Sequence, residues 1–206
     1  MKTINFKLLK FSKTLAVVPD LEKWSRGHPH HPQFAFIGKS NVGKSSLINH
    51  LGQNKKLAKV SSTPGKTQVI NVFDLNECCV IDLPGYGFAK VSKEIKGKWN
   101  ELIAAYLEFC HRTLSIFILI DPKKPLSDDD FFMMNICNEL SIPYTIIFTK
   151  IDQIPSTHLQ GIIRPRLAEI KSHLKVEPAF LLYSIKSNVG KDALTKLFEE
   201  QLSNKV

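Results

Sequence analysis

The sequence contains no apolar run approaching the roughly 20 residues that a membrane-spanning helix needs, so we expect no membrane contact. Residues 1–18 also lack a sustained apolar stretch followed by a small-residue cleavage site. Export is therefore not expected, and we predict a cytoplasmic protein. Neither an internal repeat nor a low-complexity tract is present, which is typical of an ordinary globular chain.

Cysteine is scarce, and its spacing suits neither a redox pair nor a zinc site. The four cysteines are Cys78, Cys79, Cys110 and Cys137. No two of them form a CxxC pair. We therefore expect reduced, mostly buried thiols.

Acidic residues are too few to balance the basic ones, since 19 Asp and Glu oppose 28 Lys and Arg and leave a net charge of +9. An excess of this size favours a polyanionic partner, with RNA or a ribonucleoprotein first among the candidates. The basic residues are scattered, and they lack the interleaved aromatics of an RNA-binding sheet. A merely solvated basic surface therefore remains the alternative.

The chain alternates apolar runs of strand length with longer segments of helical periodicity, and at 206 residues with 43% hydrophobic side chains it can build one core. This alternation predicts an α/β fold with a mostly parallel, six-stranded sheet and helices on both faces. Ser127 as N-cap explains the following acidic triplet without a metal. The predicted strands are 34–38, 68–74, 78–82, 114–120, 142–149 and 179–183, and the predicted helices are 44–51, 97–111, 127–140, 157–174 and 190–202.

Residues 1–33 are predicted to be an N-terminal extension, and residues 34–206 to form a single domain. The extension is proline-rich near its end and contains His28, His30 and His31. These histidines are candidate metal ligands, although a proline-interrupted run is more often solvated.

The segment Gly38-Lys-Ser-Asn-Val-Gly-Lys44-Ser45 matches the pattern GxxxxGK[ST] and lies between a predicted strand and a predicted helix. Its glycines let backbone N–H groups wrap around phosphate oxygens, and the helix N-terminus adds a favourable dipole. Lys44 is expected to reach the β- and γ-phosphates, and the Ser45 hydroxyl to bind Mg²⁺. The motif in this setting predicts a three-layer P-loop NTPase fold of the Ras-like kind, known as a G domain.

Asp82 ends an apolar strand and begins a DxxG pattern that continues through Leu83 and Pro84 to Gly85. An aspartate at a strand end can hold the Mg²⁺ hydration shell, and the Gly85 N–H can bind the γ-phosphate and respond to its loss. An Asp-Leu-Pro-Gly turn is weak evidence alone. Its position after a P-loop makes it a candidate nucleotide switch.

Thr149-Lys150-Ile151-Asp152 follows a predicted strand and matches the TKxD form of a guanine-reading motif. Asp152 can accept hydrogen bonds from guanine N1–H and the 2-amino group, whereas adenine offers neither donor, so the motif predicts GTP. Lys150 is expected to pack its stem over the base and to reach back toward the P-loop. At the end of the last strand, Tyr183-Ser184-Ile185 would present the Ile185 N–H to guanine O6.

Thr67 is our choice for the threonine that completes Mg²⁺ coordination only when GTP is bound, because it ends a polar loop just before a strand. Thr63 is the competing candidate. The residues expected to bind the nucleotide are Gly38, Lys39, Ser40, Asn41, Val42, Gly43, Lys44, Ser45, Gly65, Lys66, Thr67, Gln68, Val69, Asp82, Leu83, Pro84, Gly85, Thr149, Lys150, Ile151, Asp152, Tyr183, Ser184 and Ile185.

Taken together, GKSNVGKS, TPGKTQ, DLPGYG, TKID and Ser-Ile-Lys make the chain resemble the EngB (YihA/YsxC) family of ribosome-biogenesis GTPases in the Era-like branch. The resemblance extends from Phe34 to the C-terminal helix. It implies GTP and Mg²⁺ binding and a role in maturation of the large ribosomal subunit, with its rRNA and ribosomal proteins as partners. It also implies an association with cell division and septation. We expect a monomer.

Two positions depart from common GTPase patterns. Tyr86 follows Gly85 where Ras-like enzymes place the glutamine that orients water, so the intrinsic rate should be low. Ile185 replaces a small residue, which weakens the last base contact. Asn41 resembles a potassium-ligating asparagine of related GTPases, and K⁺ near the phosphates is a hypothesis. The residues expected to act in catalysis are Lys44, Thr67, Gly85 and Asn41.

Two alternatives belong to other functional classes. One is a nucleotide-gated binding module with negligible hydrolysis and a non-ribosomal partner. The other is a P-loop ATPase or kinase, which Asp152 disfavours because adenine would give it no donor.

Overall fold

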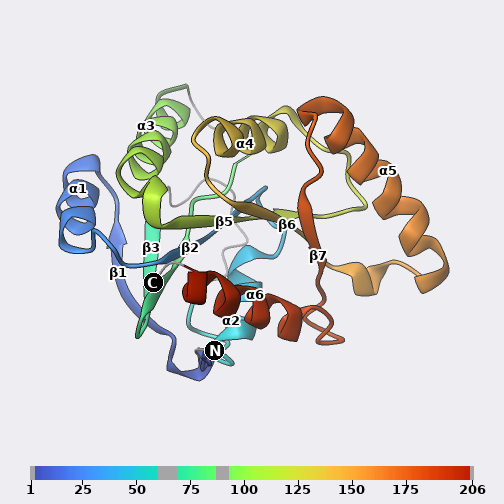
Figure 1. Cartoon of the computed structure of the whole chain (residues 1–206), viewed down its shortest axis with the longest axis horizontal. Coiled ribbons are helices and arrows are strands. Elements are labelled where there is room, and N and C mark those ends of the chain that lie inside the picture. Colours follow the sequence, from blue (N-terminus) through green and yellow to red (C-terminus); the bar gives the residue numbers. More distant parts are fainter. Residues whose placement is uncertain (1–2, 60–68, 87–92, 205–206) are drawn as a thin grey trace.

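The computed structural model describes residues 3–59, 69–86 and 93–204. Within them one sheet has the strand order β1-β3-β4-β2-β5-β6-β7 (Figure 1). The strands are β1 (Lys10–Leu15), β2 (Gln33–Gly38), β3 (Ile70–Leu75), β4 (Cys78–Asp82), β5 (Leu114–Ile120), β6 (Tyr144–Phe148) and β7 (Ala179–Leu182).

The five strands β2, β4, β5, β6 and β7 run parallel, whereas β3 pairs antiparallel with β4 and β1 antiparallel with β3. Every residue of β2 and β5 is buried, as expected for parallel strands that helices cover on both faces. In register, Phe36 lies beside Asp82 and Gly38 beside Leu119. The carboxyl ends of β2, β4 and β5 therefore meet at one edge of the sheet.

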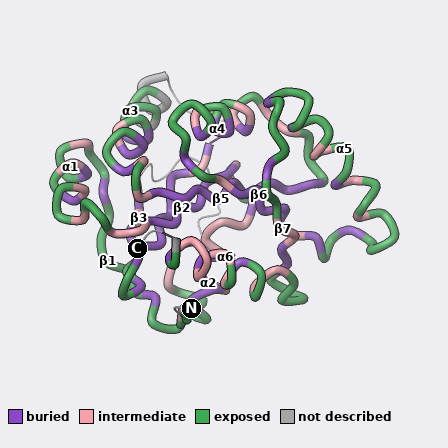
Figure 2. Tube along the Cα trace, in the orientation of Figure 1, coloured by how far each residue is buried: buried purple, intermediate pink, exposed green. Residues whose placement is uncertain are grey.

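Helices cover both faces of the sheet and complete three layers, as Figures 1 and 2 show. The α/β fold predicted from the sequence is confirmed. One face carries α1 (Val18–Gly27), α3 (Lys93–Cys110), α4 (Asp128–Glu139) and α5 (Ser156–Leu174), and the other carries α2 (Lys44–Leu51) and α6 (Lys191–Asn204). Short 3-10 helices are η1 (Phe6–Leu8), η2 (His111–Thr113) and η3 (Ile151–Gln153).

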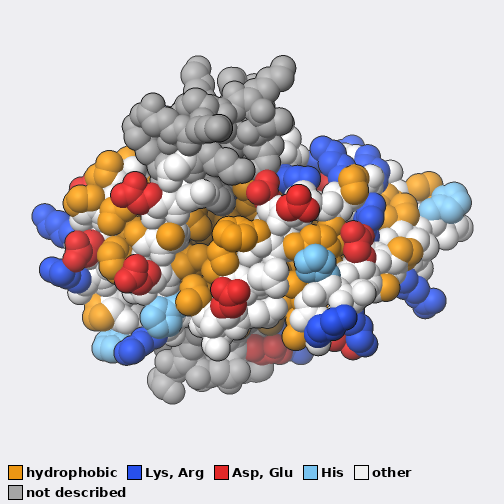
Figure 3. Space-filling model, turned by 90° about the horizontal axis from the view of Figure 1, so that it is seen from above, with side chains coloured by type: hydrophobic (Ala, Val, Ile, Leu, Met, Phe, Trp, Pro, Cys, Tyr) orange, Lys and Arg blue, Asp and Glu red, His pale blue; other side chains and the backbone are white. Residues whose placement is uncertain are grey.

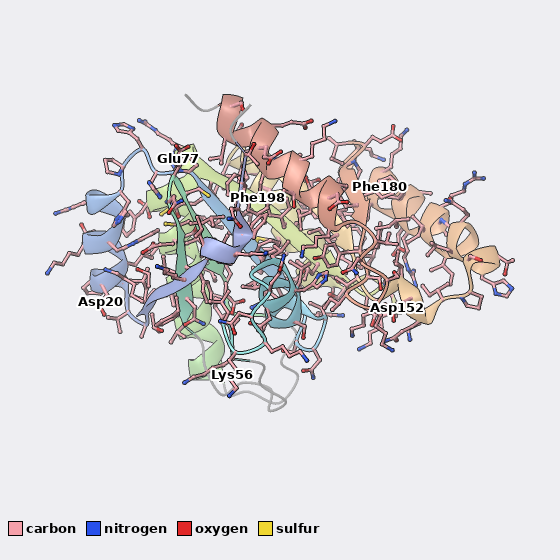
Figure 4. The ribbon with its side chains drawn as sticks, turned by 90° about the horizontal axis from the view of Figure 1, so that it is seen from below. Asp20, Lys56, Glu77, Asp152, Phe180 and Phe198 are labelled. Carbon is pink, nitrogen blue, oxygen red and sulfur yellow. The ribbon has the colours of Figure 1, made fainter. Side chains whose placement is uncertain are left out.

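The core beneath α2 and α6 is organised around Phe198 of α6, labelled in Figure 4, whose ring packs against residues of the sheet. Its ring stacks on Phe34 with centroids 4.0 Å apart and on Phe117 at 5.1 Å. Phe6 of η1 meets the same ring edge-on at 5.2 Å. The first turn of the chain thus packs against the C-terminal helix.

The sheet has one strand more than the six expected, because part of the segment interpreted as an extension joins it. Strand β1 pairs with β3, and Leu21 and Trp24 of α1 are buried in the core under α3. The strand escaped detection because five of its six residues are exposed at the sheet edge, so it lacks alternating apolar residues.

Two histidines near the end of this segment, His28 and His31, contact each other edge to face. His28 stacks on Trp24 with ring centroids 5.1 Å apart, and its Nδ1 lies 2.8 Å from the Trp24 carbonyl oxygen. Among the described residues, no group of three or more His, Cys, Asp or Glu side chains is arranged to hold a metal ion. Over the same residues, no helix is both long and apolar enough to cross a membrane.

Candidate nucleotide-binding site

Residues 38–45 connect the end of β2 to the start of α2, and their backbone conformation depends on glycine at two points. A Cβ on Gly38 would lie 2.6 Å from the Leu119 carbonyl oxygen, so no larger residue fits beside β5. Gly43 has φ +111°, in the left-handed region that favours glycine. Asn41 also has a positive φ of 64°, which asparagine tolerates better than most residues.

The DxxG segment lies directly against this loop. Leu83 N donates to the Phe36 carbonyl at 3.0 Å, and Tyr86 N donates to the Gly38 carbonyl at 3.3 Å. Ser40 N returns a bond to the Tyr86 carbonyl at 3.2 Å. These backbone bonds extend the pairing of β2 and β4 and bring Gly85 beside the P-loop.

Lys44 and Asp82 form an ion pair through Lys44 Nζ and Asp82 Oδ1. Their side chains are only 13% and 8% exposed. The partly buried carboxylate at the end of β4 is therefore already paired with a cation, the Lys44 ammonium group. Ser45 follows Lys44 in the first turn of α2. A carboxylate and a hydroxyl are oxygen ligands of the kind Mg²⁺ prefers, so the described residues fit that ion.

The other expected metal and switch residues fall largely outside the described part of the chain. Gly65, Lys66, Thr67 and Gln68 are not among the described residues, nor is the competing Thr63. Val69 is described and immediately precedes β3.

Two residues of the TKxD segment, which follows β6, donate hydrogen bonds to backbone carbonyls of the P-loop. Thr149 Oγ1 donates to the Val42 carbonyl at 2.8 Å, and Lys150 Nζ donates to the Asn41 carbonyl at 2.7 Å. Lys150 Nζ also lies 3.2 Å from Asp121 Oδ2, at the end of β5. Lys150 thus reaches back to the P-loop as expected.

The carboxylate of Asp152 is oriented by the segment that follows β7. Ser184 Oγ donates to Asp152 Oδ1 at 2.7 Å, and Lys186 Nζ lies 3.8 Å from Oδ2. Ile151 N lies 3.4 Å from the Tyr183 carbonyl oxygen and joins the two segments. Ile185, whose backbone N–H is expected to bind guanine O6, follows Ser184 and is 39% exposed.

Two residues with roles at this edge escaped the sequence analysis. His50, in the last turn of α2, has Nδ1 2.8 Å from the Tyr183 hydroxyl and Nε2 2.8 Å from Asn188 Oδ1. Burial raises the pKa of the Tyr183 hydroxyl. Asp130 accepts a hydrogen bond from Tyr86. Only the cap role of Asp130 has a sequence signal, the spacing from Ser127.

Comparison with known proteins identifies the family. The profile of the family described as 50S ribosome-binding GTPase matches residues 33–150. The probable GTP-binding protein EngB of Fusobacterium nucleatum subsp. nucleatum is 41% identical over 174 residues, which cover 84% of this chain and 87% of that protein. The chain belongs to the EngB family of GTP-binding proteins.

A second relative agrees with this assignment, and solved structures share the fold. The probable EngB of Flavobacterium psychrophilum is 40% identical over 83% of this chain and 84% of its own length. A crystal structure of a probable EngB superposes with a TM-score of 0.64 at 23% identity, covering 84% of this chain and 99% of that one. An Aquifex aeolicus Era variant bound to GDP·AlF4⁻ gives a TM-score of 0.63 at 27% identity over 82% and 56% of the chains.

Proposed function

We propose that this protein binds and slowly hydrolyses GTP with Mg²⁺, and acts as a switch in assembly of the large ribosomal subunit that normal septation requires. The main support is the arrangement at one sheet edge, where hydrogen bonds join the P-loop to the DxxG segment and to Lys150, and where Ser184 orients Asp152. The pairing of Asp152 with Ser184 leaves the carboxylate as an acceptor for guanine donors.

In the proposed reaction, a water oxygen bonds to the γ-phosphorus while the bond from that phosphorus to the bridging oxygen of GDP breaks, which yields GDP and phosphate. Lys44 leaves Asp82 to bind the β- and γ-phosphates, and Gly85 N–H donates to the γ-phosphate. Ser45 and Thr67 would hold Mg²⁺, with Asp82 near its water ligands. The ion supplies positive charge that offsets the charge developing on the phosphate oxygens.

A low intrinsic rate is proposed because the residue after Gly85 cannot orient the attacking water. The Tyr86 side chain is only 3% exposed, and its hydroxyl is already bound to Asp130. For potassium we propose a site near Asn41, whose exposed side chain lies in the P-loop. Equal hydrolysis rates in Na⁺ and K⁺, with and without ribosomal particles, would contradict that site.

A ribosomal partner is supported by the description of the family and by the net charge of +9. Lysine and arginine side chains on the face viewed in Figure 3 lie mainly toward its two ends, with acidic side chains between them. We propose that the protein acts as a cytoplasmic monomer whose GTP form docks on the subunit precursor and whose hydrolysis releases it.

The proposal is tested by measuring binding of fluorescent GTP, GDP and ATP analogues with Mg²⁺, followed by co-sedimentation with large ribosomal subunits. We expect strong guanine-nucleotide binding, no ATP binding, and sedimentation of the GTP form alone. Guanine binding without sedimentation would refute the ribosomal partner, and equal binding of ATP would refute the role of Asp152. Depletion of the protein in cells should block septation.

A second candidate is a binding module that works through its different affinities for GTP and GDP and hardly hydrolyses GTP. The buried Tyr86 favours it, because its hydroxyl is bound to Asp130 and is not free to orient water. Turnover measured with and without ribosomal particles separates the two candidates. A rate that stays negligible in both conditions would favour the module.

A further inference from the structure

Tyr86 is fixed at three points although it belongs to a segment expected to respond to nucleotide. Its side chain is 3% exposed, and its hydroxyl donates to Asp130 Oδ1 at 2.7 Å, across 44 positions in the sequence. Its backbone N–H bonds to the Gly38 carbonyl, and its carbonyl accepts from Ser40 N–H. Tyr86 therefore connects the P-loop on one side with the start of α4 on the other.

Asp130 is a buried carboxylate that receives donors on both oxygens. It is 3% exposed and lies in the first turn of α4. Oδ2 accepts from Ser127 N at 2.8 Å and from Ser127 Oγ at 2.6 Å, which leaves Oδ1 for the Tyr86 hydroxyl. A buried carboxylate oxygen without a donor is costly, so the bond to Tyr86 is strongly favoured.

The surroundings keep the hydroxyl protonated as a donor. Burial raises the pKa of Tyr86 well above its usual value, and the charges of Asp130 and Asp129 raise it further. Asp130 also lines a cavity of about 20 Å³ together with Lys124 and with Lys39 and Ser40 of the P-loop. The pair is thus an internal contact beside the nucleotide site.

Gly85 is the residue whose position depends on this contact. A Cβ on Gly85 would lie 2.9 Å from the Gly38 carbonyl oxygen and 3.5 Å from Ser40 N, so its backbone lies close against the P-loop. On the N-terminal side it follows Pro84, whose ring fixes the φ angle of Pro84 itself. On the other side it is joined to Tyr86, which is held by its bonds to Gly38, Ser40 and Asp130. Loss of the Asp130 bond would therefore leave the adjoining Gly85 backbone less firmly placed.

We propose that Tyr86 and Asp130 are positioning residues that hold the Gly85 N–H for the γ-phosphate and so contribute to the discrimination of GTP from GDP. The inference rests on the proposed contact between Gly85 and the γ-phosphate. Because GDP lacks that phosphate, the pair should affect GTP affinity and leave GDP affinity unchanged.

The test is Tyr86→Phe, which removes only the hydroxyl and keeps the buried ring. We expect the dissociation constant of a non-hydrolysable GTP analogue to rise about tenfold, as for loss of one hydrogen bond to a charged group, with the GDP constant unchanged. A merely structural role would lower stability without altering the ratio of the two constants. An unaltered ratio in folded Tyr86→Phe overturns the proposal.

Ser127→Ala is the matched control, because it weakens the cap on the same carboxylate and leaves the bond to Tyr86 in place. It should lower the melting temperature and keep the ratio of GTP to GDP affinity. In an Asp130→Ala background, Tyr86→Phe should change that ratio no further, because the bond is already lost. Independent effects of the two substitutions would contradict a shared contact.

Gly85→Ala separates the inference from the proposed function on which it rests. If it abolishes the preference for GTP while Tyr86→Phe does not, the role of Gly85 stands and the positioning role of the pair is refuted. If neither substitution alters the preference, both the contact of Gly85 with the γ-phosphate and the positioning role are refuted.

Discussion

Asp152→Asn tests most directly whether Asp152 recognises the guanine base, because the two oxygens of its carboxylate have different neighbours in the structure. Oδ1 accepts from Ser184 Oγ at 2.7 Å, and Oδ2 lies 3.8 Å from Lys186 Nζ, so among the described residues Oδ2 is the less firmly paired acceptor for guanine. In the variant, an amide oxygen that keeps the Ser184 bond turns the NH₂ group toward the base. The side-chain NH₂ donors of the variant then face the N1–H and 2-amino donors of guanine.

The expected loss follows from two hydrogen bonds to a charged acceptor. At about 1.5 kcal/mol each, the lower end of the usual range, they amount to about 3 kcal/mol, or about 100-fold in the dissociation constant. Xanthosine triphosphate carries a carbonyl in place of the 2-amino group, so the variant should bind it better than GTP. Fluorescence titration with labelled guanosine and xanthosine nucleotides measures both effects.

Ser184→Ala is the control, since it removes the donor that orients Asp152 and keeps the charge. It should weaken GTP binding by less than about tenfold and give no preference for xanthosine. The melting temperature of Asp152→Asn should stay near that of the wild type, because the amide oxygen of the variant can keep the bond from Ser184 Oγ. A change in GTP affinity of less than about threefold in folded Asp152→Asn would refute the assigned role.

Three further perturbations have outcomes set by packing or charge. Phe198→Ala removes the ring at the centre of the core under α6 and should cost about 3–5 kcal/mol of unfolding free energy, measured by urea denaturation; a loss below about 1 kcal/mol would contradict that packing. Lys44→Ala should abolish GTP and GDP binding and lower stability by about 2 kcal/mol, because the carboxylate at the end of β4 loses its cation; unchanged GDP binding in calorimetry would exclude the P-loop role. Burial raises thiol pKa values from 9.0 to about 11 for Cys110 and to about 12 for Cys78 and Cys137, so the folded chain holds these protons more tightly than the unfolded chain. Their contribution to stability is therefore complete below pH 9.0 and is lost as pH rises toward about 12; urea midpoints that do not fall over this window would contradict it.

Local patterns in the sequence were sufficient to locate most elements and the motif segments. A run such as Phe34 to Gly38 followed by GxxxxGKS implies a buried strand, a phosphate loop and a helix, because side-chain period and backbone chemistry act over a few residues. The cap formed by Ser127 and Asp130 was likewise predictable from a spacing of three residues. The family resemblance rests on the same short motifs.

Contacts between distant segments were decided only by the tertiary structure. Strand β1 has no apolar period of its own, and it joins the sheet because β3 offers an unpaired edge. The partner of Tyr86 is 44 positions away, and His50 meets Asn188 across 138 positions. Hydrogen bonds of this kind depend on how layers stack, which no local pattern encodes. The sequence by itself therefore determined which segments are expected to bind the nucleotide, and the packing of α2 and α4 around the sheet decided which side chains hold those segments in place.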